Sequence, residues 1–379
     1  MSTLDFTPEE YEARVGRLRT AMRAAGVAAM LIDDSEILAY FTGYERSVSS
    51  YRACLVPLTG EPLMILRSLD VAPFQESCRF PAHVAYPDTE DAIAAVARAV
   101  SRLGLAAAAI GFDSGSHAMT VDTYEQLCAR LPQVRFVALP GLPWELRLRK
   151  STAEIALVRR AASIADTVMA EIAARARAGS TEREWSAFAA RRFIELGGTP
   201  GHVGPITVGR GWGFLHGHLH DTPLAQGDIL HLELVPRFQG YSARLMRSVT
   251  IGPASEQRHR DAETLRDLQD AQFTAMHPGA QAADVDAILR DGVLRAGLRE
   301  HYDNITGYTL GYYSQQPLRS SDFTRVFRTG ADWLLEEGMV FHMYTSARGL
   351  AFSETVLVTA DGAERLTKME RKLFETVSD

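Results

Sequence analysis

Hydrophobic and polar positions recur with two different periods along the chain, and the changes between these periods predict its elements. Residues 9–25 carry apolar side chains at helical spacing and end at Gly26, a common helix stop. Residues 28–32 form a short apolar run that predicts a buried strand. The same pattern predicts strands at 53–66, 107–112 and 134–137 and helices at 91–103 and 121–131. Such alternation is typical of an α/β domain with a mixed or parallel sheet.

The second half of the chain opens on two helix-start signals. Two capping boxes, each a Ser or Thr followed three residues later by Glu, predict helices at 151–178 and 181–197. The later pattern predicts strands at 206–208, 229–235, 248–251 and 339–359 and helices at 262–276 and 283–296. This order of helix pair, strands, helix pair and strands indicates a duplicated α/β half that closes on a curved sheet.

A Pro-Gly-Leu-Pro run at residues 140–143 predicts a linker between these two halves. A chain of 379 residues also exceeds what one hydrophobic core usually serves. We therefore expect an α/β (α+β) fold with two domains, residues 1–145 and 146–379.

The composition excludes several classes of partner. Lys and Arg number 40 against 47 Asp and Glu, and the charge of −7 disfavours nucleic acid and anionic membranes, which both reward a basic face. No apolar run approaches the roughly 20 residues of a membrane span, and the acidic first ten residues do not resemble a secretory signal. The cysteines at 54, 78 and 128 lack CxxC spacing, so we expect reduced core residues in a cytoplasmic protein.

Four stretches of the second domain carry motifs that occur together in one known family, at residues 227–233, 240–248, 335–341 and 354–359. They resemble the pita-bread family, which includes methionine aminopeptidase, aminopeptidase P, prolidase, creatinase and ectoine hydrolase. The resemblance covers roughly residues 145–370, and residues 39–44 extend it in outline to the first domain. It implies an N-terminal creatinase-like α/β domain, a C-terminal pita-bread domain with a curved sheet, and a homodimer.

The resemblance also indicates where metal ligands would lie. The family's metallopeptidases bind two metal ions through two Asp, one His and two Glu, and the corresponding positions here hold Glu233, Arg244, Tyr308, Tyr344 and Ser353. Divalent cations need several anionic or neutral donors at one point, whereas an arginine is a permanent cation. A like charge about 4 Å away costs about 4 kcal/mol at an effective dielectric of 20. We therefore predict a site without metal or other cofactor. The polar replacements argue against a decayed pocket, because unpaired buried polar groups are costly.

His216 is the predicted general acid and base. It lies twelve residues before Asp228, the spacing at which the family keeps a histidine that touches the scissile group. In creatinase, which also lacks metal, the corresponding histidine performs this role, and imidazole suits it because its pKa lies near neutral pH. Glu233 would orient His216 or water, or attack as a nucleophile. Tyr308 and Tyr344 would donate hydrogen bonds to charge developing on the leaving group.

Arg244 is predicted to anchor a substrate carboxylate through its planar fork, or to form an ion pair with Glu233. In creatinase, the first domain of the partner subunit also supplies an arginine. The corresponding stretch here offers Tyr51 and Arg52. The complete set of predicted substrate-binding residues is Arg244, Arg52, Tyr51, Ser353, Glu354 and His218.

Two other interpretations stay open. His216, His218 and His220 alternate as they would on one face of a strand, and His231 and Glu233 follow them, so this set would offer ligands for a relocated metal. The protein would then be a metal-dependent hydrolase or lyase, such as an Xaa-Pro peptidase. Alternatively, the second domain is a non-catalytic binding module. Our prediction is a metal-independent hydrolase of the creatinase type that cleaves a C–N bond, in an amidine, cyclic amidine or amide, of a small carboxylated metabolite.

Overall fold

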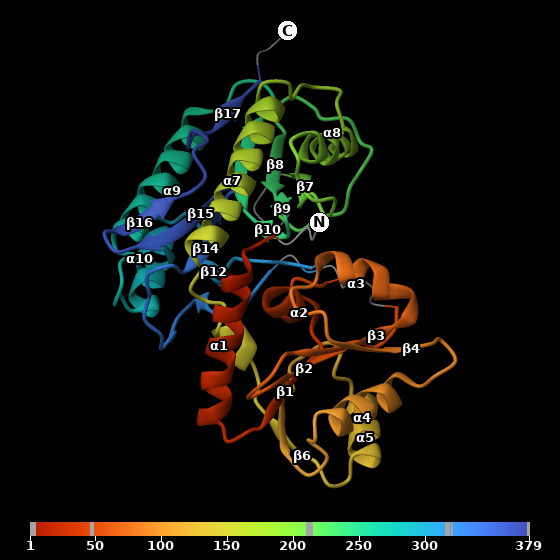
Figure 1. The fold of residues 1–379 in the computed structure, drawn as a ribbon. Helices are drawn as coiled ribbons and strands as arrows, with labels where there is room; N and C mark the ends of the chain where they lie inside the picture. Colours follow the sequence, from red (N-terminus) through yellow and green to blue (C-terminus); the bar gives the residue numbers. More distant parts are fainter. Residues whose placement is uncertain (1–4, 46–48, 210–214, 315–318, 320, 377–379) are drawn as a thin grey trace. The chain divides into compact units, whose positions relative to one another are not determined.

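The computed structural model describes residues 5–45, 49–209, 215–314, 319 and 321–376. The chain divides into two compact units (Figure 1), Met1–Arg147 with Ser314–Arg319, and Leu148–Tyr313 with Ser320–Asp379. Ser314 and Arg319 therefore belong with the first unit, although they lie far along the chain. Among the described residues, no helix combines the length and the apolar composition needed to cross a bilayer.

The first unit contains one mixed sheet. Its strands are β1 (Ala29–Ile32), β2 (Ala53–Pro57), β3 (Leu63–Arg67), β4 (His83–Tyr86), β5 (Ala109–Phe112) and β6 (Arg135–Ala138). They lie in the order β4-β3-β2-β1-β5-β6, with β2 antiparallel to both neighbours and the other pairs parallel. The predicted mixed α/β sheet is confirmed.

Helices pack against this sheet from two sides. They are α1 (Pro8–Ala24), α2 (Ser35–Thr42), α3 (Val71–Ser77), α4 (Ala92–Arg102), α5 (Val121–Arg130) and α6 (Leu142–Glu145), with a 3₁₀ turn at Ser68–Asp70. Alternate residues of β1 enter different cores, because successive strand side chains point to opposite faces. Met30 joins the core formed with α1 and α2, while Leu31 joins the core formed with α4 and α5. The short helices α2 and α3 and strand β4 were not predicted, and α6 occupies part of the predicted linker.

The second unit holds a larger, mainly antiparallel sheet (Figure 1). The strands of this unit are β7 (Ile206–Gly209), β8 (Ile229–Leu234), β9 (Arg237–Phe238), β10 (Tyr241–Ser242), β11 (Leu245–Thr250), β12 (Gly307–Thr309), β13 (Val326–Phe327), β14 (Val340–Ala347), β15 (Leu350–Thr359), β16 (Gly362–Arg365) and β17 (Phe374–Glu375). The main path runs β13-β12-β14-β15-β11-β8-β7, with β16 beside β15 and β17 beside β11, while β9 and β10 pair separately. This order confirms the predicted second sheet.

Four long helices accompany this sheet, α7 (Thr152–Ala173), α8 (Glu182–Glu195), α9 (Glu256–Thr274) and α10 (Ala282–Arg295). Both predicted capping boxes are present at the starts of α7 and α8, although α7 ends at Ala173, before the predicted residue 178. Leu232 and Leu245 belong to the core that α7 and α8 help to form. The sheet face that carries these two leucines is called the helix face.

Candidate active site

The opposite face of the second sheet, called the site face, gathers polar side chains. Directly paired residues of an antiparallel sheet point to the same side. The register aligns one row across β8, β11, β15 and β14, made of Glu233, Met246, Ser353 and Tyr344. A second row aligns Thr355 with His342 and His342 with Tyr308, and the hydroxyl of Thr355 accepts from the backbone N–H of Arg244 at 2.8 Å. The sheet register therefore brings together Glu233, Arg244, Tyr308, Tyr344 and Ser353.

An ion pair lies at the centre of this face. Arg244 Nη1 lies 2.5 Å from Glu233 Oε1, and only 8% and 1% of the two side chains are exposed. The same Nη1 donates to the Tyr308 hydroxyl, and Nη2 donates to Ser321 Oγ at 3.4 Å. Burial opposes the charged form of Arg244, but Tyr308 and Glu233 outweigh burial and raise its pKa above the ordinary value. The predicted ion pair with Glu233 is therefore present.

Three aromatic rings border the ion pair. The His342 ring stacks on Tyr344 at 5.1 Å and 15°, and Tyr308 meets His342 edge-on at 5.0 Å. Burial raises the pKa of Tyr308 to about 12 and raises the pKa of Tyr344 above its ordinary value, so both phenols keep their protons near neutral pH. Burial, followed by the charge of Arg244, holds the pKa of His342 well below its usual range. His342 was missed by the sequence reasoning, although it lies two residues before Tyr344 in a predicted strand.

The histidines before β8 do not form the predicted strand face. Residues 217–220 have no regular structure, and His216, His218 and His220 are all exposed. Glu182 holds this segment instead, because its carboxylate accepts from the N–H groups of Val208 and His220, each at 2.7 Å. A buried side chain thus satisfies the backbone where a strand partner would otherwise be needed.

His231, in contrast, is fully buried in β8 and points to the same face as Glu233. Burial lowers the pKa of His231 to about 3, and His216 contributes to this shift. Among the described residues, no hydrogen bond or ion pair joins His216 or His218 to the site face, so their roles in the site stay predictions.

The donor set does not fit a pair of metal ions. Within the described part of the chain, no group of three or more His, Cys, Asp and Glu side chains is placed to hold a metal ion. The proposed set of His218, His220, His231 and Glu233 is thus not assembled. At the position where a metallopeptidase of the family would bind cations, the guanidinium of Arg244 forms an ion pair with the carboxylate of Glu233. Because an arginine does not lose its proton, it repels a divalent ion at this position.

Ser353 and Glu354 are adjacent in sequence but lie on opposite faces of β15. Ser353 joins the site face, and Glu354 points to the helix face, where it pairs with Arg247 at 2.8 Å. The alternation of side chains along a strand makes this separation unavoidable. The prediction that Glu354 joins the substrate site is therefore wrong.

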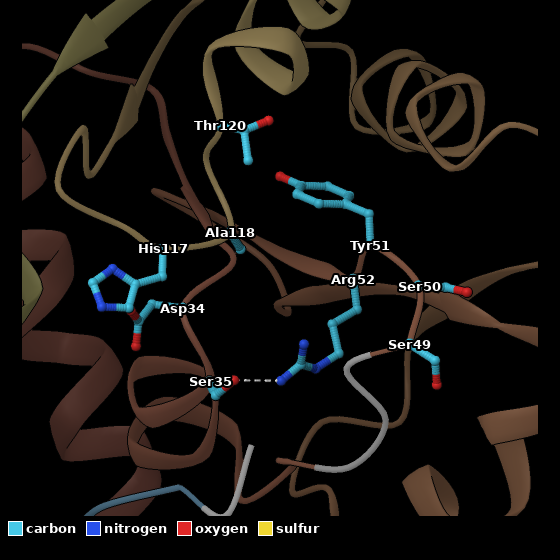
Figure 2. Close-up of a pocket in the computed structure, with 9 residues that line it drawn as sticks. All are labelled: Asp34, Ser35, Ser49, Ser50, Tyr51, Arg52, His117, Ala118 and Thr120. Carbon is cyan, nitrogen blue, oxygen red and sulfur yellow. Dashed lines mark hydrogen bonds between the residues drawn. The ribbon is translucent and has the colours of Figure 1, made fainter. Parts of the chain in front are cut away.

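Tyr51 and Arg52 line a cavity of about 400 Å³ in the first unit (Figure 2). Arg52 is only 6% exposed and donates to Ser35 Oγ at 2.6 Å, and Tyr51 donates to Asp33 at 3.0 Å. Burial raises the pKa of Asp33 to about 6 and that of Asp34, which also lines the cavity, to about 7. Both predicted residues therefore belong to a polar pocket of the first unit.

Comparison with known proteins agrees with this architecture. Residues 156–360 match Metallopeptidase family M24, and residues 14–149 match the Creatinase/Prolidase N-terminal domain. Ectoine hydrolase from Halomonas elongata is 26% identical over 402 residues, which cover 98% of each chain. The probable dipeptidase PepE from Mycobacterium tuberculosis is 26% identical over 379 residues, 99% of each chain. The crystal structure of dipeptidase PepE from Mycobacterium ulcerans has a TM-score of 0.83 at 24% identity, covering 98% of this chain and 100% of that one, and this likeness shows the fold.

Proposed function

The chain belongs to metallopeptidase family M24, and from this premise we propose that it is a metal-independent hydrolase of a C–N bond in a small carboxylated metabolite. The bond would belong to an amidine, a cyclic amidine or an amide. The observation that carries the proposal is the buried pair of Glu233 and Arg244, which replaces metal ligands with a fixed cation and its counterion. The similarity to a protein named ectoine hydrolase supports a hydrolase that acts outside peptides.

The proposed chemistry divides between the exposed histidine and the buried carboxylate. His216 takes a proton from water or from the attacking group and returns it to the leaving nitrogen, which an imidazole does well near neutral pH. Glu233 orients the water or His216, or attacks the substrate carbon itself. Its Oε2 atom has no hydrogen-bond partner among the described residues, so this oxygen is available for either role.

The remaining site residues would stabilise charge and hold the substrate. Tyr308 and Tyr344 keep their protons, so each is able to donate a hydrogen bond to charge that develops on the leaving group. Arg244 attracts the substrate carboxylate while it stays paired with Glu233. In a homodimer, the first unit of the other subunit would contribute its Tyr51 and Arg52. The Nε atom of Arg52, which has no partner among the described residues, supports an anionic ligand there.

A peptidase is the second candidate function. The probable dipeptidase PepE is as similar to this chain as ectoine hydrolase is, at 26% identity. The site does not reproduce the metal donors that the family's metallopeptidases use, so peptide hydrolysis would also have to proceed through Glu233 and His216.

One experiment tests the proposal against its alternatives. The purified protein is analysed for manganese, zinc, iron and cobalt, and is then assayed with and without EDTA against ectoine, creatine, guanidino acids and Xaa-Pro dipeptides. We expect turnover of an amidine or amide, with no stoichiometric metal and no loss of rate in EDTA. About two metal ions per chain that are required for turnover would contradict the proposal. Binding of these compounds without any turnover would identify a non-catalytic module.

A further inference from the structure

Three buried side chains of the site face have unused hydrogen-bonding atoms. Within the residues that the structure describes, no partner is found for Glu233 Oε2, for Ser353 Oγ or for either ring nitrogen of His342. All three residues are at most 1% exposed. An unsatisfied buried polar group costs about 1–3 kcal/mol, so a set of three on one face indicates that a bound molecule supplies the missing partners.

These three residues come from β8, β14 and β15, with β11 between β8 and β15, and they border one continuous set of contacts. Glu233 pairs with Arg244, Arg244 donates to Tyr308, and Tyr308 packs against His342. Ser353 faces Tyr344 across the β14–β15 pair, and Tyr344 stacks on His342. A small ligand on this face would therefore meet all three groups.

The unused atoms are mainly acceptors. An ionised carboxylate only accepts hydrogen bonds, a serine hydroxyl accepts and donates, and a neutral imidazole has one acceptor and one donor nitrogen. His342 is neutral because burial and the nearby Arg244 both disfavour its charged form. Arg244 engages Glu233 and Tyr308 through Nη1, so its attraction for the substrate carboxylate does not satisfy these unused acceptors. The ligand that complements this face thus brings hydrogen-bond donors.

We propose that His342 is a specificity-determining residue, and that the substrate carbon under attack is bonded to nitrogen whose N–H groups donate to His342 and to one lone pair of Glu233 Oε2, which leaves that oxygen a second lone pair for its role in the reaction. This inference rests on the proposed function and narrows its substrate class to amidines and primary amides. The nitrogen of an Xaa-Pro bond is a member of the proline ring and carries no hydrogen. An Xaa-Pro bond would therefore leave both acceptors unfilled, and such dipeptides are poor substrates.

Binding of small probes tests the inference without any need for turnover. Acetamide and N,N-dimethylacetamide form a neutral pair in which methyl groups replace both N–H hydrogens, and acetamidine adds a charged donor. Their affinities for the wild-type protein and for His342→Phe are measured by ligand-observed NMR titration. Phenylalanine keeps the ring that stacks on Tyr344 but removes both nitrogens. We expect acetamide and acetamidine to bind the wild-type protein at least about tenfold more tightly than the dimethylated probe, and we expect His342→Phe to lose about tenfold for these two probes alone.

Thr345→Val is the matched control, because Thr345 is an equally buried residue of β14 on the helix face. It should leave all three affinities unchanged. A second measurement uses wild-type protein labelled with ¹⁵N-histidine, whose His342 signal is assigned by its absence in His342→Asn. Acetamidine should shift the acceptor nitrogen of that ring. Equal binding of acetamide and its dimethyl derivative, or an unshifted His342 signal at saturating acetamidine, overturns the inference. Probe binding as expected in a protein that turns over no compound would instead contradict the proposed function.

Discussion

Two buried arginine–glutamate pairs lie on opposite faces of the second sheet. Arg244 pairs with Glu233 on the site face, and Arg247, three residues later, pairs with Glu354 on the helix face. Both pairs are almost fully removed from solvent, and Glu354 also lies 3.4 Å from Arg371 Nε and 3.7 Å from Arg365 Nη1. The two pairs differ in how completely the charged atoms are hydrogen-bonded.

The helix-face pair is saturated. All five N–H groups of Arg247 have acceptors, namely Glu354 Oε1 and the carbonyl oxygens of Met246, Ser353, Met369 and Glu370. Glu354 also accepts from the Thr367 hydroxyl through its second oxygen. On the site face, Glu233 Oε2 has no partner among the described residues. A buried ion pair whose polar atoms all have hydrogen-bond partners connects strands and loops. A pair with a carboxylate oxygen that lacks a partner is suited to binding a ligand.

The largest expected effect separates the two pairs by activity. Replacing Glu233 with Gln removes the proposed nucleophile or orienting base while leaving an acceptor for Arg244, and turnover should fall by roughly 10²–10⁴. Glu354→Gln should leave turnover per folded molecule within about twofold, because that side chain lies on the other face. Steady-state kinetics on the substrate found by screening measures both. Equal losses in the two variants would break the distinction between the faces.

His216→Ala should have a comparable effect on turnover, roughly 10²–10⁴, since it removes the proposed proton carrier. Because His216 is exposed, the free energy of unfolding should change by less than about 0.5 kcal/mol. His218→Ala, also exposed and nearby in the chain, is the matched variant. Full activity in His216→Ala would transfer the acid–base role to another group.

Stability should show the reverse contrast. Glu354→Ala leaves the guanidinium of Arg247 buried without a counterion and should lower the free energy of unfolding by about 3–5 kcal/mol. Glu364→Ala is the control, because Glu364 pairs with Arg159 at a partly exposed site, where an ion pair contributes about 0–1 kcal/mol. Urea unfolding of both variants measures the difference. A loss below 1 kcal/mol in Glu354→Ala would mean that the saturated pair does not hold the sheet together.

The same contrast explains which parts of the site were predictable from sequence. The motif spacing named Glu233, Arg244, Tyr308, Tyr344 and Ser353, and the sheet register gathers them on one face. The strands that carry Glu233, Tyr344 and Ser353 were predicted from the apolar pattern, whereas the strand that carries Tyr308 was not. Glu354 was misassigned because adjacency in sequence was given more weight than the alternation of strand side chains.

His342 and the histidine loop were harder to predict. The importance of His342 depends on the Tyr308 ring, which reaches it from the paired strand β12, and on stacking with Tyr344 of its own strand. A single sequence does not record the first of these contacts. The alternating His216, His218 and His220 imitate a strand, but the backbone N–H of His220 donates to Glu182 in helix α8. The grouping of Ser314 and Arg319 with the first unit was unforeseeable for the same reason, since it depends on long-range bonds to Glu36.

Acid should lower the free energy of unfolding through the buried His231 of the site face. The pKa of His231 falls from an ordinary value of 6.5 to about 3 in the folded protein. Between these two values, His231 is protonated in the unfolded chain and neutral in the folded protein. His231 therefore costs no stability above pH 6.5, and the free energy of unfolding falls as the pH drops from 6.5 toward 3, by up to about 1.4 kcal/mol per pH unit.

Urea unfolding at pH 7.5, 6.0 and 5.0 tests this dependence. His231→Phe should show a smaller loss between pH 7.5 and 5.0 than the wild-type protein, and the difference isolates His231 from the titrating carboxyl groups. The variant is compared only with itself across pH, so a uniform loss of stability does not affect the result. Parallel pH profiles would show that His231 accepts its proton in the folded state.

The smallest expected effect concerns one hydroxyl. Tyr344→Phe keeps the ring that stacks on His342 and removes an oxygen that accepts a long hydrogen bond from Asn304 Nδ2, at 3.4 Å. The free energy of unfolding should therefore change by less than about 1 kcal/mol. Turnover should fall about tenfold if the hydroxyl donates to the leaving group, because one neutral hydrogen bond in the transition state is then lost. Tyr308→Phe does not serve as a clean comparison, since the Tyr308 hydroxyl also accepts from Arg244. Unchanged turnover in Tyr344→Phe would leave Tyr344 with a packing role beside His342, and the open carboxylate of Glu233 would then be the main feature that distinguishes the site face from the helix face.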